Sequence, residues 1–150
     1  EGNIYRLDLP PATDYDVERF LALLQRPTTP ERLQQAIDLY TGPYLPRYEQ
    51  PWAVGLRNNL AERYINAQLE LASMLFATDA AAALEHYQAV LVVDPFHTHA
   101  VMGLMQAHTM LGRRSYALDL YHDYTRRINE NGLDPDRAVE QVYRQLLDER

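Results

Sequence analysis

Hydrophobic side chains recur every three or four residues along most of this chain, which is the spacing of one face of an α-helix. The longest such stretch extends from Trp52 to about Ala77 and contains no internal proline. Its apolar positions are Leu56, Leu60, Tyr64, Ala67, Leu71 and Met74. This pattern predicts one long helix with an apolar face.

Six shorter stretches show the same period between helix start and stop signals. One helix capped by Asp14 or Asp16 should end near Gln25, and the next should lie between Thr29-Pro30-Glu31 and Thr41-Gly42-Pro43. Two more are expected from about Ala80 to Val93 and from about Thr98 to Leu111. The fifth of these stretches carries Ala117, Tyr121, Tyr124 and Ile128 and ends at Asn131-Gly132. The last starts near Asp136 and should bury Val139, Val142, Tyr143, Leu146 and Leu147. We therefore predict an all-α fold of about seven helices.

The segment from Ile4 to Leu9 differs, because apolar and polar residues alternate there before Pro10-Pro11. This alternation is typical of a strand, and one strand alone forms no sheet. We assign residues 1–11 to a linker or to a strand remnant of a preceding domain, and residues 12–150 to the helical domain.

Part of the chain repeats with a period of about 34 residues, which is that of tetratricopeptide repeats. Ala83, Leu84 and Tyr87 recur as Ala117, Leu118 and Tyr121. In this register the two alanines lie where paired helices cross, and the two tyrosines fill the groove between helices. Gly112 falls at the turn between paired helices and Pro95 at the end of a repeat. The same Ala-x-x-x-Tyr pattern at Ala36 and Tyr40 is displaced by an insertion around residues 42–51. We predict a tetratricopeptide-like helical-repeat bundle.

Composition supports the helical prediction and excludes several kinds of chemistry. The chain has 22 leucines and 17 alanines against 8 valines and 4 isoleucines, a balance that favours helix. It has no cysteine, so disulfides, cysteine-based zinc sites and catalytic thiols are excluded. No apolar run approaches the roughly 20 residues that cross a bilayer. We expect a soluble, cytoplasmic domain without membrane contact. Because the first residue is Glu1 and not Met, we also expect the chain to be a piece of a longer protein.

The charge of the chain argues against direct DNA contact. Its net charge is −7, and all 14 basic residues are arginines. Affinity for DNA comes largely from phosphate neutralisation by Lys and Arg. The two basic doublets, Arg113-Arg114 and Arg126-Arg127, flank one expected helix that also carries Asp119 and Asp123. We interpret these two carboxylates as part of a solvated helix face paired with the nearby arginines.

Candidate catalytic or metal-binding residues are few. The five histidines are His86, His97, His99, His108 and His122. None forms the helical i, i+4 pair that metal sites commonly use. No glycine-rich phosphate loop or nucleophile motif occurs. We therefore predict no metal, no cofactor and no enzyme activity.

The proline-rich connector before the long helix carries three large aromatic residues, Tyr44, Tyr48 and Trp52. Exposed aromatic residues often anchor a protein partner. The simpler interpretation, which we prefer, is that they pack the connector onto the long helix.

Several segments together resemble the bacterial transcriptional activator domain, the helical domain that follows the winged-helix DNA-binding domain in Streptomyces antibiotic regulatory proteins. The resemblance is carried by the segment from Ala36 to Pro46, which includes Tyr40, Gly42 and Pro43, and by Trp52 and the Arg57-x-x-Leu60-x-x-x-Tyr64 pattern. It extends to Tyr5-Arg6-Leu7, Asp16-Val17-x-x-Phe20, Asp94-Pro95, Leu111-Gly112-Arg113 and Leu133-Asp134-Pro135. The sequence departs from the family pattern at two positions near the start of the long helix, where Pro51 immediately precedes Trp52 and Gly55 follows.

The resemblance implies a regulatory, protein-interacting domain of a bacterial transcriptional regulator. Its expected partners are the adjacent DNA-binding domain, the transcription machinery or a second copy. The interaction candidates are Tyr40, Gly42, Pro43, Trp52, Arg57, Arg113 and Arg114. The alternative is a tetratricopeptide-type peptide-binding adaptor or scaffold, which would need a concave face presenting arginines, because the chain has no lysine.

Overall fold

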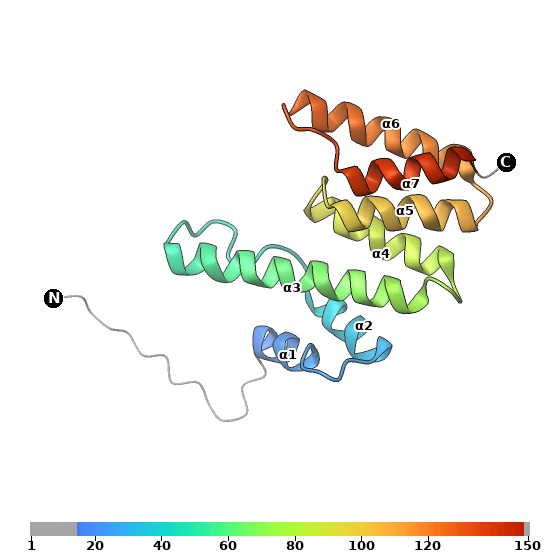
Figure 1. The fold of residues 1–150 in the computed structure, drawn as a ribbon. Helices are drawn as coiled ribbons and strands as arrows, with labels where there is room; N and C mark the ends of the chain where they lie inside the picture. Colours follow the sequence, from blue (N-terminus) through green and yellow to red (C-terminus); the bar gives the residue numbers. More distant parts are fainter. Residues whose placement is uncertain (1–14, 149–150) are drawn as a thin grey trace.

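The computed structural model describes residues 15–148, which form seven α-helices and no strand (Figure 1). The helices are α1 (Asp16–Leu23), α2 (Pro30–Leu39), α3 (Pro51–Leu75), α4 (Ala80–Val93), α5 (Thr98–Met110), α6 (Arg114–Glu130) and α7 (Arg137–Asp148). The predicted all-α class and the number of helices are confirmed. The strand pattern at residues 4–9 lies outside the described residues.

Several helices begin where a side chain accepts a hydrogen bond from the first turn. Thr29 accepts from the backbone N–H of Arg32 at the start of α2, and Asp79 accepts from that of Ala82 at the start of α4. Asp136 accepts from the N–H of Ala138 at the start of α7. Of the two expected caps of α1, Asp14 lies outside the described residues. Asp16 is not the cap, because it is the first residue of α1 and its carboxylate accepts from the N–H of Val17.

The long helix α3 begins one residue earlier than its sequence predicts, at Pro51. Proline suits the first helical position, since the N–H that it lacks would have no partner in the helix there. Gly55 lies inside the helix without interrupting it. The two departures from the family pattern therefore leave the start of α3 intact.

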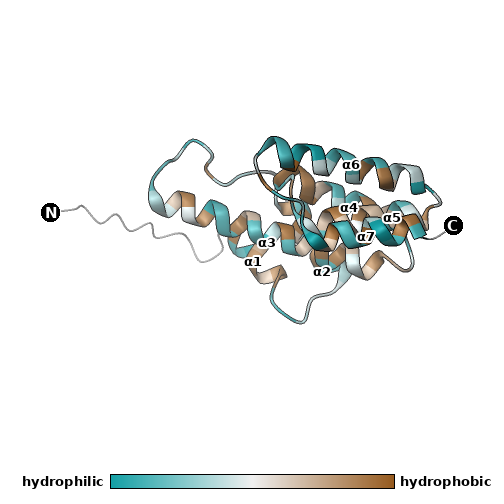
Figure 2. Ribbon diagram, turned by 45° about the horizontal axis from the view of Figure 1, so that its top comes forward, coloured by the Kyte–Doolittle hydropathy of each residue, from teal (hydrophilic) through white to brown (hydrophobic). Residues whose placement is uncertain are grey.

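The helices form an extended stack in which each contacts the next in sequence, and α5 also contacts α7 (Figure 1). Separate buried clusters lie between α1, α2 and α3, between α3, α4 and α5, and between α5, α6 and α7. Figure 2 shows α4 largely in white and brown, whereas α6 and α7 carry long hydrophilic stretches. Because each cluster is shared only by neighbouring helices, the arrangement is that of a helical-repeat stack.

The repeat is regular for α4 and α6, whose first residues, Ala80 and Arg114, keep the tetratricopeptide period. It is irregular for α5 and α7, whose first residues, Thr98 and Arg137, lie farther apart than one period. The difference arises because α6 has 17 residues against 14 in α4, and because the loop before α7 is also longer.

The last helix, α7, buries a narrower face than its sequence predicts. Its buried residues are Val139, Val142 and Leu146. The expected burial of Leu147 is wrong, since its side chain is 44% exposed, and Tyr143 is only half-buried.

Within residues 15–148, none of the helices is both long and apolar enough to span a membrane.

Candidate interaction site

One arginine of α3 hydrogen-bonds the backbone of the connector between α2 and α3. The Arg57 guanidinium donates hydrogen bonds to the backbone carbonyl oxygens of Tyr44 (3.4 Å), Leu45 (2.5 Å) and Tyr48 (3.0 Å). Arg57 thus satisfies three carbonyls of an irregular segment that has no helical partners. The family-motif arginine therefore fixes the shape of the connector.

Tyr40 begins the connector and packs inward. Its ring stacks on Tyr64 of α3 with a centroid distance of 4.3 Å and lies 6.1 Å from the ring of Phe20 in α1. Burial raises the pKa of Tyr40 above its ordinary value. Gly42, two residues later, has a φ of +149°, a conformation that favours glycine. This allows the chain to turn across α3 between α2 and the connector.

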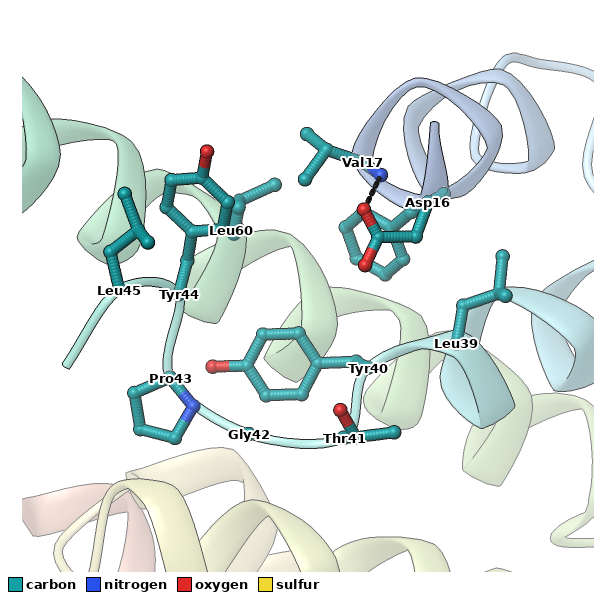
Figure 3. A pocket seen from close by; sticks show the side chains of 11 residues that line it. Asp16, Val17, Leu39, Tyr40, Thr41, Gly42, Pro43, Tyr44, Leu45 and Leu60 are labelled. Atoms are coloured by element: carbon teal, nitrogen blue, oxygen red, sulfur yellow. Dashed lines mark hydrogen bonds between the residues drawn. The ribbon is translucent and has the colours of Figure 1, made fainter. Parts of the chain in front are cut away.

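A hollow of about 220 Å³, which we call the Tyr44 hollow, opens between α1, α3 and the connector (Figure 3). Figure 3 shows Tyr40 lying across it below Asp16 and Val17, with Tyr44 and Leu45 at the opposite end from Leu39. At its rim the Tyr15 and Tyr44 hydroxyl oxygens are hydrogen-bonded at 2.8 Å. That hydrogen bond, together with burial, raises the pKa of Tyr15 to about 12. The first described residue is thereby tied to the connector.

A second hollow of about 520 Å³, the Val92 hollow, lies on the other side of the segment from Tyr40 to Pro43. Its remaining walls come from Tyr64 of α3 and from Ala89, Val92 and Val93 of α4. The side chain of Val92 is 83% exposed there. The motif residues Tyr40, Gly42 and Pro43 thus separate two hollows.

A buried polar chain joins α3 to α4 beside the Val92 hollow. Gln68, which is 2% exposed, donates to the Tyr64 hydroxyl and accepts from Nδ1 of His86 at 2.6 Å. Burial lowers the pKa of His86 below its ordinary value, against a smaller opposite effect of Glu85. Because burial disfavours the charged imidazole and Nδ1 faces the Gln68 oxygen, we assign this histidine a structural role.

The three connector aromatics differ in their surroundings. Tyr44 is half-buried against α1, whereas Tyr48 is 50% exposed and Trp52 is 60% exposed. The preferred interpretation, that all three pack the connector onto the long helix, is therefore wrong for Tyr48 and Trp52. Backbone carbonyls bonded to Arg57 hold the connector instead, which leaves these two side chains free to point outward.

The basic doublets are largely engaged within the domain. The Arg114 guanidinium donates to two carbonyl oxygens in the last turn of α7. Its Nε lies 2.8 Å from the oxygen of Leu146, and a terminal nitrogen lies 3.2 Å from that of Leu147. Arg126 and Arg127 both pair with Asp123. The predicted pairing of this helix face is confirmed for Asp123. Arg113 is exposed at the start of α6.

The repeat residues are found at helix contacts, although the two tyrosines are not equivalent. Ala83 and Ala117 are fully buried, and Gly112 has a φ of +70° in the turn before α6. Tyr87 is 9% exposed and its ring lies against Gly103 of α5. Tyr121 is half-buried and stacks on Tyr143 at 3.9 Å.

The reason for this difference is the displacement of α7 from the regular period. When the first residues of α5 and α7 are aligned, Gly103 falls opposite Val142 and its neighbour Leu104 opposite Tyr143. Larger side chains therefore occupy the place where Tyr121 would reach the backbone of the next helix. Pro95, at the end of the first repeat, is exposed in the turn between α4 and α5.

The histidines are dispersed over the helices. No group of three or more His, Asp or Glu side chains suited to a metal ion occurs in residues 15–148. The Nδ1 atoms of His97 and His108 are buried without a hydrogen-bond partner within this range. Burial, with the nearby Arg113, lowers the pKa of His108.

Two positions with clear structural roles were missed or misread in the sequence. The role of Gly103 could have been predicted, because a glycine within a helix is destabilising and often marks a place where a neighbouring group packs closely. Arg114 was singled out as an interaction candidate, but its partners lie 32 and 33 residues away, and no local pattern indicates them.

Comparison with known families gives one match: the family model described as Bacterial transcriptional activator domain covers residues 15–147. The matched range starts at Tyr15 and ends one residue before the end of α7. No curated protein and no solved structure matches the chain significantly.

Proposed function

Since this chain belongs to the family of bacterial transcriptional activator domains, we propose that it is the regulatory, protein-contacting domain of a transcriptional regulator whose winged-helix DNA-binding domain lies outside residues 1–150. In this proposal residues 12–150 are the regulatory domain and residues 1–11 connect it to the preceding one. The regulator acts in the cytoplasm and this domain performs no catalysis.

The observation that carries the proposal is that several arginine side chains contact groups of the domain itself. Of the four arginines in the basic doublets, Arg114 donates to carbonyl oxygens of α7, and Arg126 and Arg127 form surface ion pairs with Asp123. Arg57 is likewise bonded to the connector. Because phosphate binding requires free Lys or Arg side chains, these contacts and a net charge of −7 disfavour a DNA-reading surface.

The partners in this proposal are proteins, which the connector supports. Tyr48 and Trp52 are large, exposed and amphipathic, and such residues are enriched at protein interfaces. The segment from Tyr40 to Pro43 and the two hollows beside it extend the same surface.

The peptide-binding adaptor is less well supported. The hollow shared by α3, α5 and α7 is lined by Phe76, Gln106, Thr109, Met110, Val142, Gln145 and Leu146. No charged side chain is among these described lining residues, whereas a clamp for a peptide carboxylate would require arginines there.

Gel retardation with the target promoter tests the proposal. The 150-residue chain alone should not retard promoter DNA at moderate salt, whereas the complete regulator should. Sequence-specific retardation by the chain alone, abolished by Arg113→Ala, would make this domain a DNA reader. Arg113 is the suitable position, because Arg114→Ala would also release the last turn of α7.

A further inference from the structure

Two exposed aromatic side chains project from the same end of the molecule. Tyr48 precedes α3 and Trp52 is its second residue, with exposed fractions of 50% and 60%. Figure 1 shows that this end of α3 extends beyond the neighbouring helices, with the connector folded back along it. We define the connector face as Tyr44, Leu45, Tyr48 and Trp52. Aromatic residues in such positions dominate the binding energy of many interfaces.

The connector face is held in shape before any partner binds. Arg57 bonds three of its carbonyls, the N–H of Tyr48 bonds the carbonyl of Leu45 at 3.0 Å, and Pro46 and Pro51 restrict the backbone. A surface that is already ordered loses little conformational entropy on association. The exposure of Tyr48 and Trp52 is therefore a property of a fixed segment.

The position of Tyr15 indicates what covers this surface. The Tyr15 hydroxyl is bonded to that of Tyr44, so the polypeptide that precedes residue 15 must start beside the connector face. The Tyr44 hollow lies at the same junction and is lined by Asp16, Val17, Tyr44 and Leu45. The end of α7 lies at the opposite end of the molecule from the start of α3 (Figure 1). A segment tethered at Tyr15 thus has a high effective concentration at the connector face, and one tethered after α7 does not.

We propose that the connector face is the docking surface for the domain that precedes the linker of residues 1–11 in the same polypeptide, with Tyr48 and Trp52 as its anchors. This inference rests on the proposed function, in which that domain is the DNA-binding domain outside residues 1–150. The Tyr15–Tyr44 contact fixes where the preceding domain leaves the helical stack, and Arg57 fixes the surface that it meets.

Hydroxyl-radical footprinting read by mass spectrometry tests this proposal, because Trp, Tyr and Met side chains are oxidised when exposed. The 150-residue chain and the complete regulator are labelled in parallel, both without DNA. Oxidation of Tyr48 and Trp52 should be at least several-fold slower in the complete regulator. Tyr116 and Met110, which are 64% and 54% exposed near the other end of the stack, serve as internal controls and should react equally in both proteins.

Equal oxidation of Tyr48 and Trp52 in the two proteins would overturn the proposal. Protection within the 150-residue chain that rises with its concentration would also overturn it, because the surface would then bind a second copy. A footprint needs neither promoter binding nor transcription. Failure of the proposed function in gel retardation is therefore distinguishable from failure of the docking surface.

A pair of variants in the complete regulator supplies a second measurement. Tyr48→Ala with Trp52→Ala should accelerate proteolytic cleavage just before residue 15 several-fold, because the preceding part no longer docks. Tyr116→Ala is the matched exposed control and should leave cleavage unchanged. Both proteins should unfold at nearly the wild-type temperature, since the altered side chains are exposed. Unchanged cleavage in the double variant would contradict the proposal.

Discussion

Gly103 sets the distance between α4 and α5 by having no side chain. A Cβ at this position would lie 2.4 Å from the nearest ring carbon of Tyr87. Gly103→Ala should destabilise the fold, because overpacking costs about 1–3 kcal/mol while the gain in helix propensity is about 1 kcal/mol. Urea unfolding of the 150-residue chain measures the difference.

Gly55 is the matched control, because it also lies within a helix but has nothing within 4 Å of the Cβ position. Gly55→Ala should raise the free energy of unfolding by up to about 1 kcal/mol. In a Tyr87→Ala background, Gly103→Ala should lower the free energy of unfolding much less than it does in the wild type. If both glycine substitutions stabilise equally, the contact between Gly103 and Tyr87 is not the constraint described.

Two histidines should make the fold less stable in mild acid. Burial lowers the pKa of His86, and burial together with Arg113 lowers that of His108. As the pH falls below the ordinary histidine value of about 6.5, the unfolded chain therefore takes up protons before the folded one. The free energy of unfolding should decrease between pH 7.5 and 5.5, and urea denaturation at both values measures this.

His86→Gln combined with His108→Gln should reduce the decrease in the free energy of unfolding between pH 7.5 and 5.5. His122→Gln, at an exposed position, should not. An equal loss in the double variant and the wild type would contradict the assignment to these two groups.

The sequence indicated some of these single-residue roles and not others. Thr29 and Pro30 occupy the expected start of α2, because the contacts that start a helix are local. The buried Gln68 and the cap formed by Arg114 depend on helices that are distant in sequence, so no local pattern reveals them.

The connector between α2 and α3 depends on the side chain of Arg57. Arg57→Ala removes hydrogen bonds to three carbonyls and should cost roughly 1.5–3 kcal/mol, the range for a hydrogen bond to a charged group. Amide hydrogen exchange at Tyr48 should accelerate, because its N–H···O=C bond to Leu45 opens. Arg47→Ala, at an exposed position of the same connector, is the control. A loss no greater than that of Arg47→Ala would show that the connector is held otherwise.

The two repeat tyrosines should differ in their contribution to stability. Tyr87→Ala should cost about 3 kcal/mol, as expected for a large buried side chain. Tyr121→Ala should cost clearly less, because Tyr121 is half-buried and loses chiefly its stacking on Tyr143. Chemical denaturation of the two variants checks this, and equal losses would restore the equivalence that the repeat period suggests.

The sequence predicted the positions of the helices better than the contacts between them. The spacing of Ala83 and Ala117 located α4 and α6 correctly, because both helices keep the period. It could not predict the packing of Tyr121, since the longer α6 and its following loop shift α7. The sequence pattern placed Pro51 just before the long helix, whereas it is the first residue of α3, a position that favours proline.

For the whole molecule, membership of the activator-domain family and the internal use of arginines point in the same direction. A stack of seven helices offers a long surface, and the connector face is its aromatic end. We expect the domain to change the output of a promoter-bound regulator without contributing to promoter recognition.

Transcription in vitro from the target promoter, with promoter occupancy measured on the same template, tests this expectation most directly. The complete regulator should occupy the promoter and activate transcription. A regulator lacking residues 15–147 should still occupy the promoter but lose most of its activation. Undiminished activation without these residues, or loss of occupancy together with promoter binding by the 150-residue chain alone, would contradict the role proposed for this domain.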